Sequence, residues 1–211
     1  KILVTNLLKK ARDADRQMAL LPTQAKNKIL LSVAERIADQ EEAILQANER
    51  DVKNVGKTFE GEGNRERVKE GVDRVRLTPD GVKAMVETIR RVADLPDPVG
   101  DIPEMEQRPN GMQVSRVRAP IGVIAIISEF GPQTMAESVS LCLKSGNVCV
   151  YRCAAEWPQT NAILGALWSK AAEEGGVPSG ALTFIDRPDK EAAVELFRQP
   201  KYVDAVIPKG G

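Results

Sequence analysis

The 211-residue chain contains no histidine. A histidine-based triad, an imidazole metal ligand or a histidine acid–base pair therefore cannot be built from its residues. Cysteine is scarce as well, and Cys142, Cys149 and Cys153 are odd in number and lie in apolar segments. Their spacing is not that of a zinc site, so we expect no metal site and reduced thiols rather than a disulfide framework.

Excess charge of either sign and long apolar runs are also missing. Thirty Lys and Arg residues balance thirty Asp and Glu residues, which removes the electrostatic basis for a nucleic-acid or anionic-membrane partner. No run reaches the ~20 apolar residues that a membrane span needs. Residues 1–21 have the pattern of an amphipathic helix with acidic residues rather than that of a signal peptide, so we expect a cytoplasmic protein.

The composition that is present fits a globular protein. Hydrophobic residues make up 42% and charged residues 28% of the chain, which favours a folded class over disorder. The length suits one large domain, or one domain with an appendage.

Residues 1–100 show helical periodicity only. Apolar residues recur at helical spacing through residues 24–55. The polar, glycine-rich stretch 57–71 predicts a mobile loop, followed by a short basic helix. Thr78 and Pro79 have the residue types of an N-cap and a first helical position, so a further helix is expected from there. We therefore predict that this part is a helical layer of a cofactor domain, packed on a sheet.

Residues 101–119 predict a β-hairpin arm. Two alternating runs flank Asn110 and Gly111, and Asn-Gly is a strong hairpin turn signal. The apolar side of the arm is formed by Met112, Val114 and Val117. Because a two-stranded arm with a polar face is of little use to a monomer, we expect it to pair with another subunit, as in a homo-oligomer.

Residues 120–211 alternate between strand and helix patterns. The run 121–127 is apolar on both faces, as in a buried parallel strand. Three further strand patterns follow, each preceded by a helix pattern, at residues 147–151, 181–185 and 204–207. This alternation implies right-handed βαβ units and a Rossmann-like parallel sheet. The predicted fold class is α/β, with flanking helices, the N-terminal helical layer and a protruding β-hairpin.

The four strand exits are the candidate site, because a parallel sheet binds ligands beyond the carboxyl ends of its strands. None of them carries the Gly-x-Gly-x-x-Gly fingerprint of ordinary dinucleotide sites. A phosphate is expected at the helix that begins near Gln133, or at a helix following Gly211. The alternative is that all four are ordinary tight turns.

Arg152 and Glu156 flank the turn after the second parallel strand. In a functional interpretation Glu156 accepts hydrogen bonds from ribose hydroxyls, and Arg152 supplies positive charge to the adenosine ribose or its 2'-phosphate. The alternative is a solvent-exposed ion pair of little energetic value. In the same region, Lys144 is expected to complement the carboxyl end of its own helix and Gly146 to take a left-handed cap.

Cys153 is the only thiol at a strand exit. With Arg152 beside it but no histidine in the chain, nothing supplies the base that a nucleophile needs, so catalysis by Cys153 is disfavoured. Cys142 and Cys149 are expected to be small buried hydrophobes.

Four blocks of sequence carry a family resemblance by their order and spacing. They are "LPDPVG", "RPNGMQVSRVRAPIGVIAII", "LCLKSGN" and "YVDAVIPKGG". The chain resembles, from its first helix to its last glycine, the γ-glutamyl phosphate reductases (glutamate-5-semialdehyde dehydrogenases) of proline biosynthesis, a branch of the aldehyde dehydrogenase superfamily. The resemblance implies NADPH-dependent reduction of γ-glutamyl phosphate to the semialdehyde through a cysteine thioester. It also implies a Rossmann-like cofactor domain with an oligomerisation hairpin, joined to a catalytic domain.

The same resemblance assigns site residues. The implied cofactor-binding residues are Glu129, Pro132, Arg152, Glu156, Gly210 and Gly211. Gln133 stands where the family has an asparagine that helps to stabilise an oxyanion. The nucleophilic cysteine of the family lies in a catalytic domain that we expect beyond residue 211, so this chain is predicted to be inactive alone.

Two departures from the family bear on the cofactor. The side chain of Gln133 is one methylene longer than the family's asparagine, and Cys153 and Ala154 replace two glycines. Because β-carbons close space that glycines leave open, NADPH binding is expected to be weakened or lost while the fold is retained. The competing hypotheses are a divergent, non-catalytic relative acting as a binding or interaction module, and an unrelated Rossmann-like binding module.

Overall fold

The computed structural model describes residues 2–59, 65–185 and 190–210. Its helices are α1 (Ile2–Ala19), α2 (Thr23–Asp39), α3 (Glu41–Phe59), α4 (Arg65–Val75), α5 (Pro79–Asp94), α6 (Pro132–Lys144), α7 (Pro158–Glu174) and α8 (Lys190–Phe197). Its strands are β1 (Glu104–Gln107), β2 (Gln113–Arg116), β3 (Val123–Ser128), β4 (Val148–Arg152), β5 (Leu182–Ile185) and β6 (Ala205–Lys209). Within these residues no helix is both long and apolar enough to cross a membrane.

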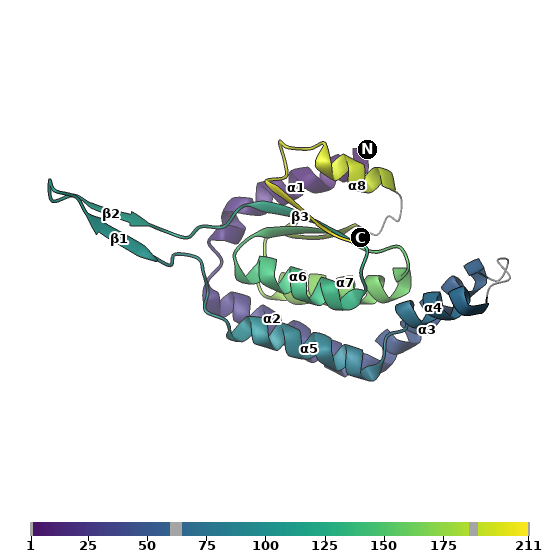
Figure 1. Ribbon diagram of the computed structural model, residues 1–211. Coiled ribbons are helices and arrows are strands. Elements are labelled where there is room, and N and C mark those ends of the chain that lie inside the picture. The colour runs from purple at the N-terminus through teal and green to yellow at the C-terminus, as the bar shows by residue number, and fades with distance from the viewer. Residues whose placement is uncertain (1, 60–64, 186–189, 211) are drawn as a thin grey trace.

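The molecule is layered around one parallel sheet (Figure 1). Helices α1 and α8 cover one face of the sheet, α6 and α7 cover the other, and α2 and α5 form a further layer outside α6 and α7. Because both faces are covered, every residue of β3 and β4 is buried, as expected for central strands of a parallel sheet. The Rossmann-like α/β fold predicted from the sequence is confirmed.

The strand order in the described sheet is β5-β4-β3-β6, with all pairs parallel. The chain therefore adds β4 and then β5 on one side of β3, and afterwards places β6 on the other side of β3. At the returning strand, the Asp204 carboxylate accepts a hydrogen bond from the Val123 amide at 2.8 Å. It fills the space in which a β-carbon at Gly122 would lie, so only glycine fits there. This contact aligns the starts of β3 and β6.

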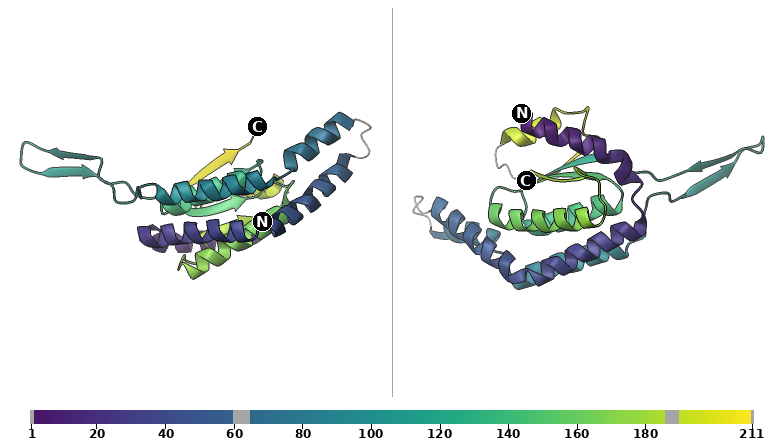
Figure 2. Two further views of the ribbon diagram at one scale, coloured as in Figure 1. Left: turned by 90° about the horizontal axis from the view of Figure 1, so that it is seen from below. Right: turned by 180° about the vertical axis from the view of Figure 1, so that it is seen from behind.

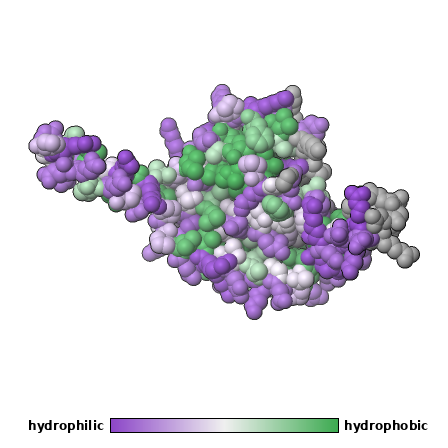
Figure 3. Space-filling model, in the orientation of Figure 1, coloured by the Kyte–Doolittle hydropathy of each residue, from purple (hydrophilic) through white to green (hydrophobic). Residues whose placement is uncertain are grey.

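One edge of β6 pairs with β3, and its other edge carries no strand among the described residues. Ile207 on β6 and Val194 and Phe197 on α8 leave large apolar side chains in solvent. Figure 3 shows apolar surface on this side of the molecule, around α8 and the end of the sheet. Pro208 lies on the same strand, where a residue without an N–H group is compatible with an edge.

The predicted mobile loop at residues 57–71 is mostly helical. Helix α3 continues to Phe59 and α4 begins at Arg65, and only residues 60–64 of the stretch lie outside the description. Val52 and Val55 of α3 pack against Val75 at the end of α4 and against Trp157. This tertiary packing overrides the low helix propensity of the glycine-rich sequence. By contrast, the helix cap at Thr78 is confirmed, since its hydroxyl accepts from the Gly81 amide at 3.1 Å.

The hairpin of β1 and β2 is confirmed, and it projects away from the sheet on the side opposite to α3 and α4 (Figure 2). Its loop is closed by a hydrogen bond from the Arg108 amide to the Met112 carbonyl at 2.7 Å, and Gly111 has a φ of 85°. The predicted apolar side, however, is not covered by this chain. Every residue of both strands is exposed, as are Met112 and Val117 next to them.

A buried polar cluster joins the helical layer to α6. The ammonium of Lys26 in α2 lies 2.9 Å from the Asp97 carboxylate. Lys144 at the end of α6 donates to Asn27 Oδ1 at 2.6 Å and to the Ala93 carbonyl at 2.7 Å. Lys144 lies in the last turn of its own helix, as expected, and its ammonium also binds a carbonyl in the last turn of α5. The left-handed cap expected of the glycine two residues later is confirmed by its φ of 71°.

Asp97 links the stability of this cluster to pH. Burial alone would raise the pKa of its carboxyl, but hydrogen bonds from Lys26, the Val99 amide and Thr23 outweigh burial and hold the pKa below 3.8. A depressed folded pKa gives a contribution to stability that is fully present above about pH 5 and is lost as the pH falls through 3.8 and then through the folded pKa.

We therefore predict that Asp97→Asn lowers the free energy of unfolding by about 3 kcal/mol at neutral pH, because Lys26 is left buried without its charge partner. The difference from the wild type should shrink as the pH falls below 3.8. Urea denaturation between neutral and acidic pH measures it. The control is Asp101→Asn, which removes an exposed carboxylate 3.4 Å from Arg118. Equal pH profiles for wild type and Asp97→Asn would contradict this role.

Candidate functional site

The exits of β3 and β6 lie side by side where the strand order reverses. Such a switch point opens a crevice outside the carboxyl ends of the two strands. The Glu129 amide donates to the Lys209 carbonyl at 2.8 Å. A β-carbon placed on Gly210 would lie 2.5 Å from Glu129 Oε2, so the backbone at Gly210 packs directly on that side chain. The sheet therefore brings together two of the residues singled out from the sequence.

A cavity of about 540 Å³ opens at the exit of β3 and shares Glu129 with this crevice. Its walls are residues 129–133 after β3, residues 74–77 at the end of α4 and just beyond it, and Trp157. Three predicted site residues, Glu129, Pro132 and Gln133, are thus in one wall. The volume is within the usual range for small-molecule sites.

Two buried side chains hold the wall formed by residues 74–77. Asn48 of α3 donates to the Val75 carbonyl at 2.9 Å and accepts from the Leu77 amide at 2.7 Å. The indole N–H of Trp157 donates to the same Val75 carbonyl at 2.9 Å. The roles of Asn48 and Trp157 do not follow from the sequence, because their partners are remote in sequence and no local pattern marks them.

The amino end of α7 is already occupied by a carboxylate. Asp51 of α3 is fully buried, at 0% exposure. It accepts from the Gln159 amide at 3.0 Å, the Thr160 amide at 2.9 Å and the Thr160 hydroxyl at 2.7 Å. Free amides at a helix start attract anions, and here Asp51 fills that position. A phosphate therefore has no place at α7, which leaves the crevice at β3 and β6.

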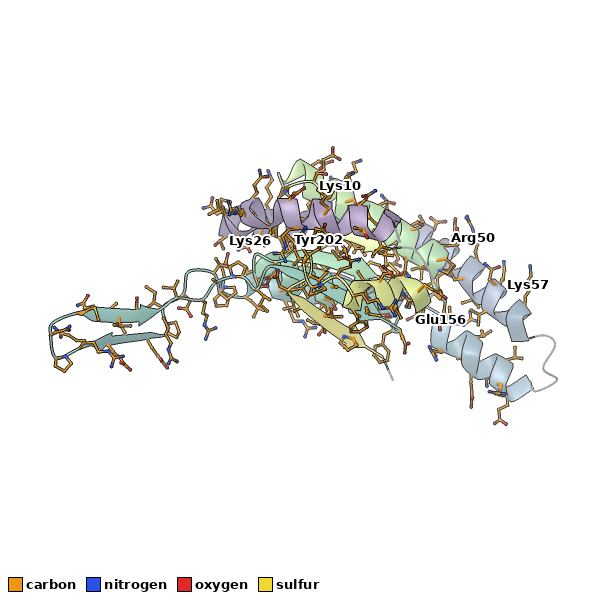
Figure 4. The ribbon with its side chains drawn as sticks, turned by 90° about the horizontal axis from the view of Figure 1, so that it is seen from above. Lys10, Lys26, Arg50, Lys57, Glu156 and Tyr202 are labelled. Atoms are coloured by element: carbon orange, nitrogen blue, oxygen red, sulfur yellow. The ribbon has the colours of Figure 1, made fainter. Side chains whose placement is uncertain are left out.

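Arg152 and Glu156 are not the solvent-exposed pair that was one interpretation of the sequence. Arg152 ends β4 and is only 7% exposed, so that interpretation is wrong. Glu156 is partly exposed and accepts a hydrogen bond from Arg74 Nη2 of α4 at 3.3 Å. In Figure 4 Glu156 lies close to the C-terminal end of α4. The positively charged neighbour of Glu156 thus comes from a different element.

The β-carbons of Cys153 and Ala154 point into packed regions. Cys153 belongs to the main core cluster, and Ala154 packs with Val75 and Trp157 behind the cavity. Neither side chain lines the cavity. Gly211 and most of the exit 185–190 lie outside the described residues, so their predicted roles are not addressed by the structure.

The thiols of Cys142, Cys149 and Cys153 are all buried and free of disulfides. A hydrogen bond with Cys142, together with burial, holds the pKa of Cys149 well above its ordinary value, which keeps that sulfur protonated and unreactive. Among the described residues no group of three or more Cys, Asp or Glu side chains is arranged to hold a metal ion.

The cavity wall presents positive charge and an aromatic face to a ligand. Arg74 and Arg76 are exposed at its wall and offer charge to phosphates. The exposed ring of Phe130 offers a stacking face. A β-carbon on Gly131 would lie 3.0 Å from Gln133 Oε1 and 3.3 Å from the ring of Trp157, so glycine keeps this wall open.

Comparison with known proteins places the chain in a family. A family model described as "Aldehyde dehydrogenase family" matches residues 3–210. The chain belongs to the aldehyde dehydrogenase family. This membership and the matches below confirm the resemblance found in the sequence.

Within this family, several of the relatives and solved structures that the chain clearly resembles are gamma-glutamyl phosphate reductases. The gamma-glutamyl phosphate reductase of Caldanaerobacter subterraneus subsp. tengcongensis is 39% identical over 204 residues, covering 96% of this chain and 47% of that protein. The crystal structure of the Thermotoga maritima gamma-glutamyl phosphate reductase has a TM-score of 0.87 at 31% identity, over 99% of this chain and 49% of that one. The Saccharomyces cerevisiae counterpart has a TM-score of 0.84 at 25% identity, over 99% and 51%. The chain thus spans about half the length of the relatives that it matches.

More distant solved structures show the fold alone. A glyceraldehyde-3-phosphate dehydrogenase from Methanocaldococcus jannaschii, complexed with NADP, has a TM-score of 0.64 at 16% identity, over 99% of this chain and 46% of that one. A betaine aldehyde dehydrogenase from Staphylococcus aureus, in complex with NAD+, has a TM-score of 0.68 at 18% identity, over 96% and 36%. The fold thus accompanies either dinucleotide.

We predict that Asp51→Ala lowers the free energy of unfolding by about 2–3 kcal/mol, because the Gln159 amide and the buried amide and hydroxyl of Thr160 lose their acceptor. Urea denaturation followed by circular dichroism measures the loss. The matched control is Glu49→Ala, which removes an exposed carboxylate from the same helix and should change stability by less than about 0.5 kcal/mol. Equal effects of the two substitutions would contradict the capping role.

Proposed function

We propose that this chain is the cofactor-binding part of a γ-glutamyl phosphate reductase. The reaction reduces γ-glutamyl phosphate to glutamate 5-semialdehyde with NADPH and releases phosphate. The observation that carries the proposal is the cavity at the exit of β3, in a chain that aligns with the Thermotoga maritima reductase over 99% of its length. The cofactor, when bound, supplies the hydride.

In this proposal the residues of the chain bind and orient rather than react. Glu129, resting on Gly210, shapes the floor of the crevice, and Arg74 and Arg76 attract the phosphates of the cofactor. The side-chain amide of Gln133 is exposed at the cavity wall, where it would donate a hydrogen bond to an oxyanion. These roles rest on position in the cavity and on the match to the family pattern.

The nucleophile of the reaction must come from elsewhere. All three thiols of this chain are buried, and a thiolate has to reach the acyl phosphate to displace its phosphate group. We propose that the cysteine is supplied by the part of the reductase that the relatives have beyond the matched half. The chain on its own would then bind cofactor without reducing substrate.

A second candidate is a non-catalytic relative that serves as a binding or interaction module. It is favoured by Gln133 in place of the family's asparagine, since Gln133 lines the cavity whereas Cys153 and Ala154 do not. Both candidates predict no reduction by the chain alone. They differ in whether the crevice still binds the cofactor.

Calorimetric titration with NADPH separates the two candidates. We expect saturable binding, which would be several-fold weaker in Gly210→Ala because the new β-carbon displaces Glu129. Glu129 is exposed and its carboxylate free to move, so this variant should remain folded. Gly56→Ala is the matched control, since its β-carbon meets only an ordinary contact at 3.8 Å from Val72. No saturable binding by the wild type at millimolar NADPH would contradict the proposal and favour the second candidate.

We further propose that the hairpin joins copies of the chain into a homo-oligomer, because both of its faces are exposed and an isolated two-stranded ribbon is marginally stable. Val114→Lys should shift the mass measured by light scattering toward that of a monomer, since it places a charge on the apolar side. Ser115→Lys, on the opposite face of the same strand, should shift it less. A monomeric wild type at high concentration would contradict the proposal.

A further inference from the structure

Glu156 and Arg74 form a charge pair beside the cavity, at the exit of β4. Arg74 Nη2 lies 3.3 Å from Glu156 Oε1, and the two side chains are 63% and 38% exposed. An exposed pair of this kind is held weakly. A guanidinium has five N–H donors, so one contact to Glu156 leaves others for a ligand.

Because Arg152 is buried, another arginine near Glu156 has to supply positive charge to a bound ribose or its 2'-phosphate. A carboxylate near the ribose of a dinucleotide accepts from its 2'-hydroxyl, and an arginine nearby accommodates a 2'-phosphate. Arg152 is 7% exposed at the end of β4 and belongs to the interior. Arg74 is the exposed arginine that touches Glu156, and it also lines the cavity.

We propose that Arg74 selects NADP over NAD by binding the 2'-phosphate of the adenosine ribose, a role that rests on the proposed cofactor-binding function. Glu156 alone would repel a phosphate, and its pairing with Arg74 offsets that repulsion. The remaining donors of the guanidinium then engage the phosphate in the paired geometry that Arg favours. A 2'-hydroxyl, being neutral, gains little from the same arginine.

The backbone holds Arg74 ready for this role. The next residue, Val75, is buried, and its carbonyl accepts from both Asn48 and the indole of Trp157. The last turn of α4 is therefore fixed against α3 and against the residues after β4. Only the side chain of Arg74 has to reorient when a phosphate arrives, so little ordering is required on binding.

Arg76 provides the matched comparison. It lines the same cavity and is also exposed, but the contact with Glu156 is made by Arg74. We assign Arg76 to general attraction of the phosphates that NADPH and NADH share. The substitutions Arg74→Gln and Arg76→Gln remove the same charge from the same wall, and only the first removes the partner of Glu156.

The test is calorimetric titration of the wild type, Arg74→Gln and Arg76→Gln with NADPH and NADH, and with 2',5'-ADP and 5'-AMP as fragments that differ only in the 2'-phosphate. We expect the wild type to bind NADPH about 10- to 100-fold more tightly than NADH. Arg74→Gln should lose most of this preference by weakening NADPH and 2',5'-ADP alone. Arg76→Gln should weaken both dinucleotides by similar factors and keep the preference.

The outcomes separate this assignment from the function on which it rests. Equal affinities of the wild type for the two cofactors, or a preference unchanged in Arg74→Gln, would overturn the role of Arg74 and leave cofactor binding intact. Absence of binding by either dinucleotide would overturn the proposed function and this assignment with it. Both arginines are exposed, and equal thermal unfolding midpoints would verify that the variants are folded.

Discussion

The structure depends on strand β3, whose two faces must be covered and whose backbone groups must be hydrogen-bonded along both edges. β3 is buried on both faces, so its backbone groups need partners along both edges, and β4 and β6 provide them. Because β6 returns to β3 from the far end of the chain, the strand order reverses between them. The reversal creates the crevice, and the crevice brings Gly210 onto Glu129.

Besides covering apolar surface, the helical layer provides buried polar side chains that bind remote parts of the chain. Three polar side chains of α2 and α3 are buried and reach elements much later in the sequence: Lys26 reaches Asp97, Asn48 reaches Val75 and Leu77, and Asp51 reaches the start of α7. Each satisfies groups that would otherwise be buried without partners. Asn48 thereby fixes the wall of the cavity, and Asp51 fills the anion position at the start of α7.

The features that could be predicted from the sequence are those determined by residues close together in the chain. The apolar run of β3, the cap at Thr78, the turn at Asn110–Gly111 and the left-handed Gly146 all follow from residue types and spacing, and the structure confirms each of them. The blocks shared with γ-glutamyl phosphate reductases also predicted the fold correctly. Three of the predicted site residues meet in one wall because they are adjacent in sequence.

What the sequence did not predict lies in contacts between distant elements. Arg74 and Glu156 are 82 residues apart, and Asp51 and Thr160 are 109 apart, so no periodicity relates them. The burial of Arg152 depends on neighbouring elements that cover the end of β4. The stretch 57–71 was misjudged because its glycines suggested a loop, whereas packing of α4 on α3 and Trp157 keeps it helical.

Among the described residues, the edge of β6 that faces away from β3 carries no strand, and this edge bears on how the chain behaves in concentrated solution. An unpaired strand edge is a template for strands of other molecules, and Ile207 beside it adds apolar surface. Pro208 interrupts the row of N–H donors on that strand, so annealing along the whole edge is blocked part-way. Self-association at this edge would therefore start from the folded molecule and would not require unfolding. A substitution that raises the unfolding temperature would then leave the tendency to associate unchanged.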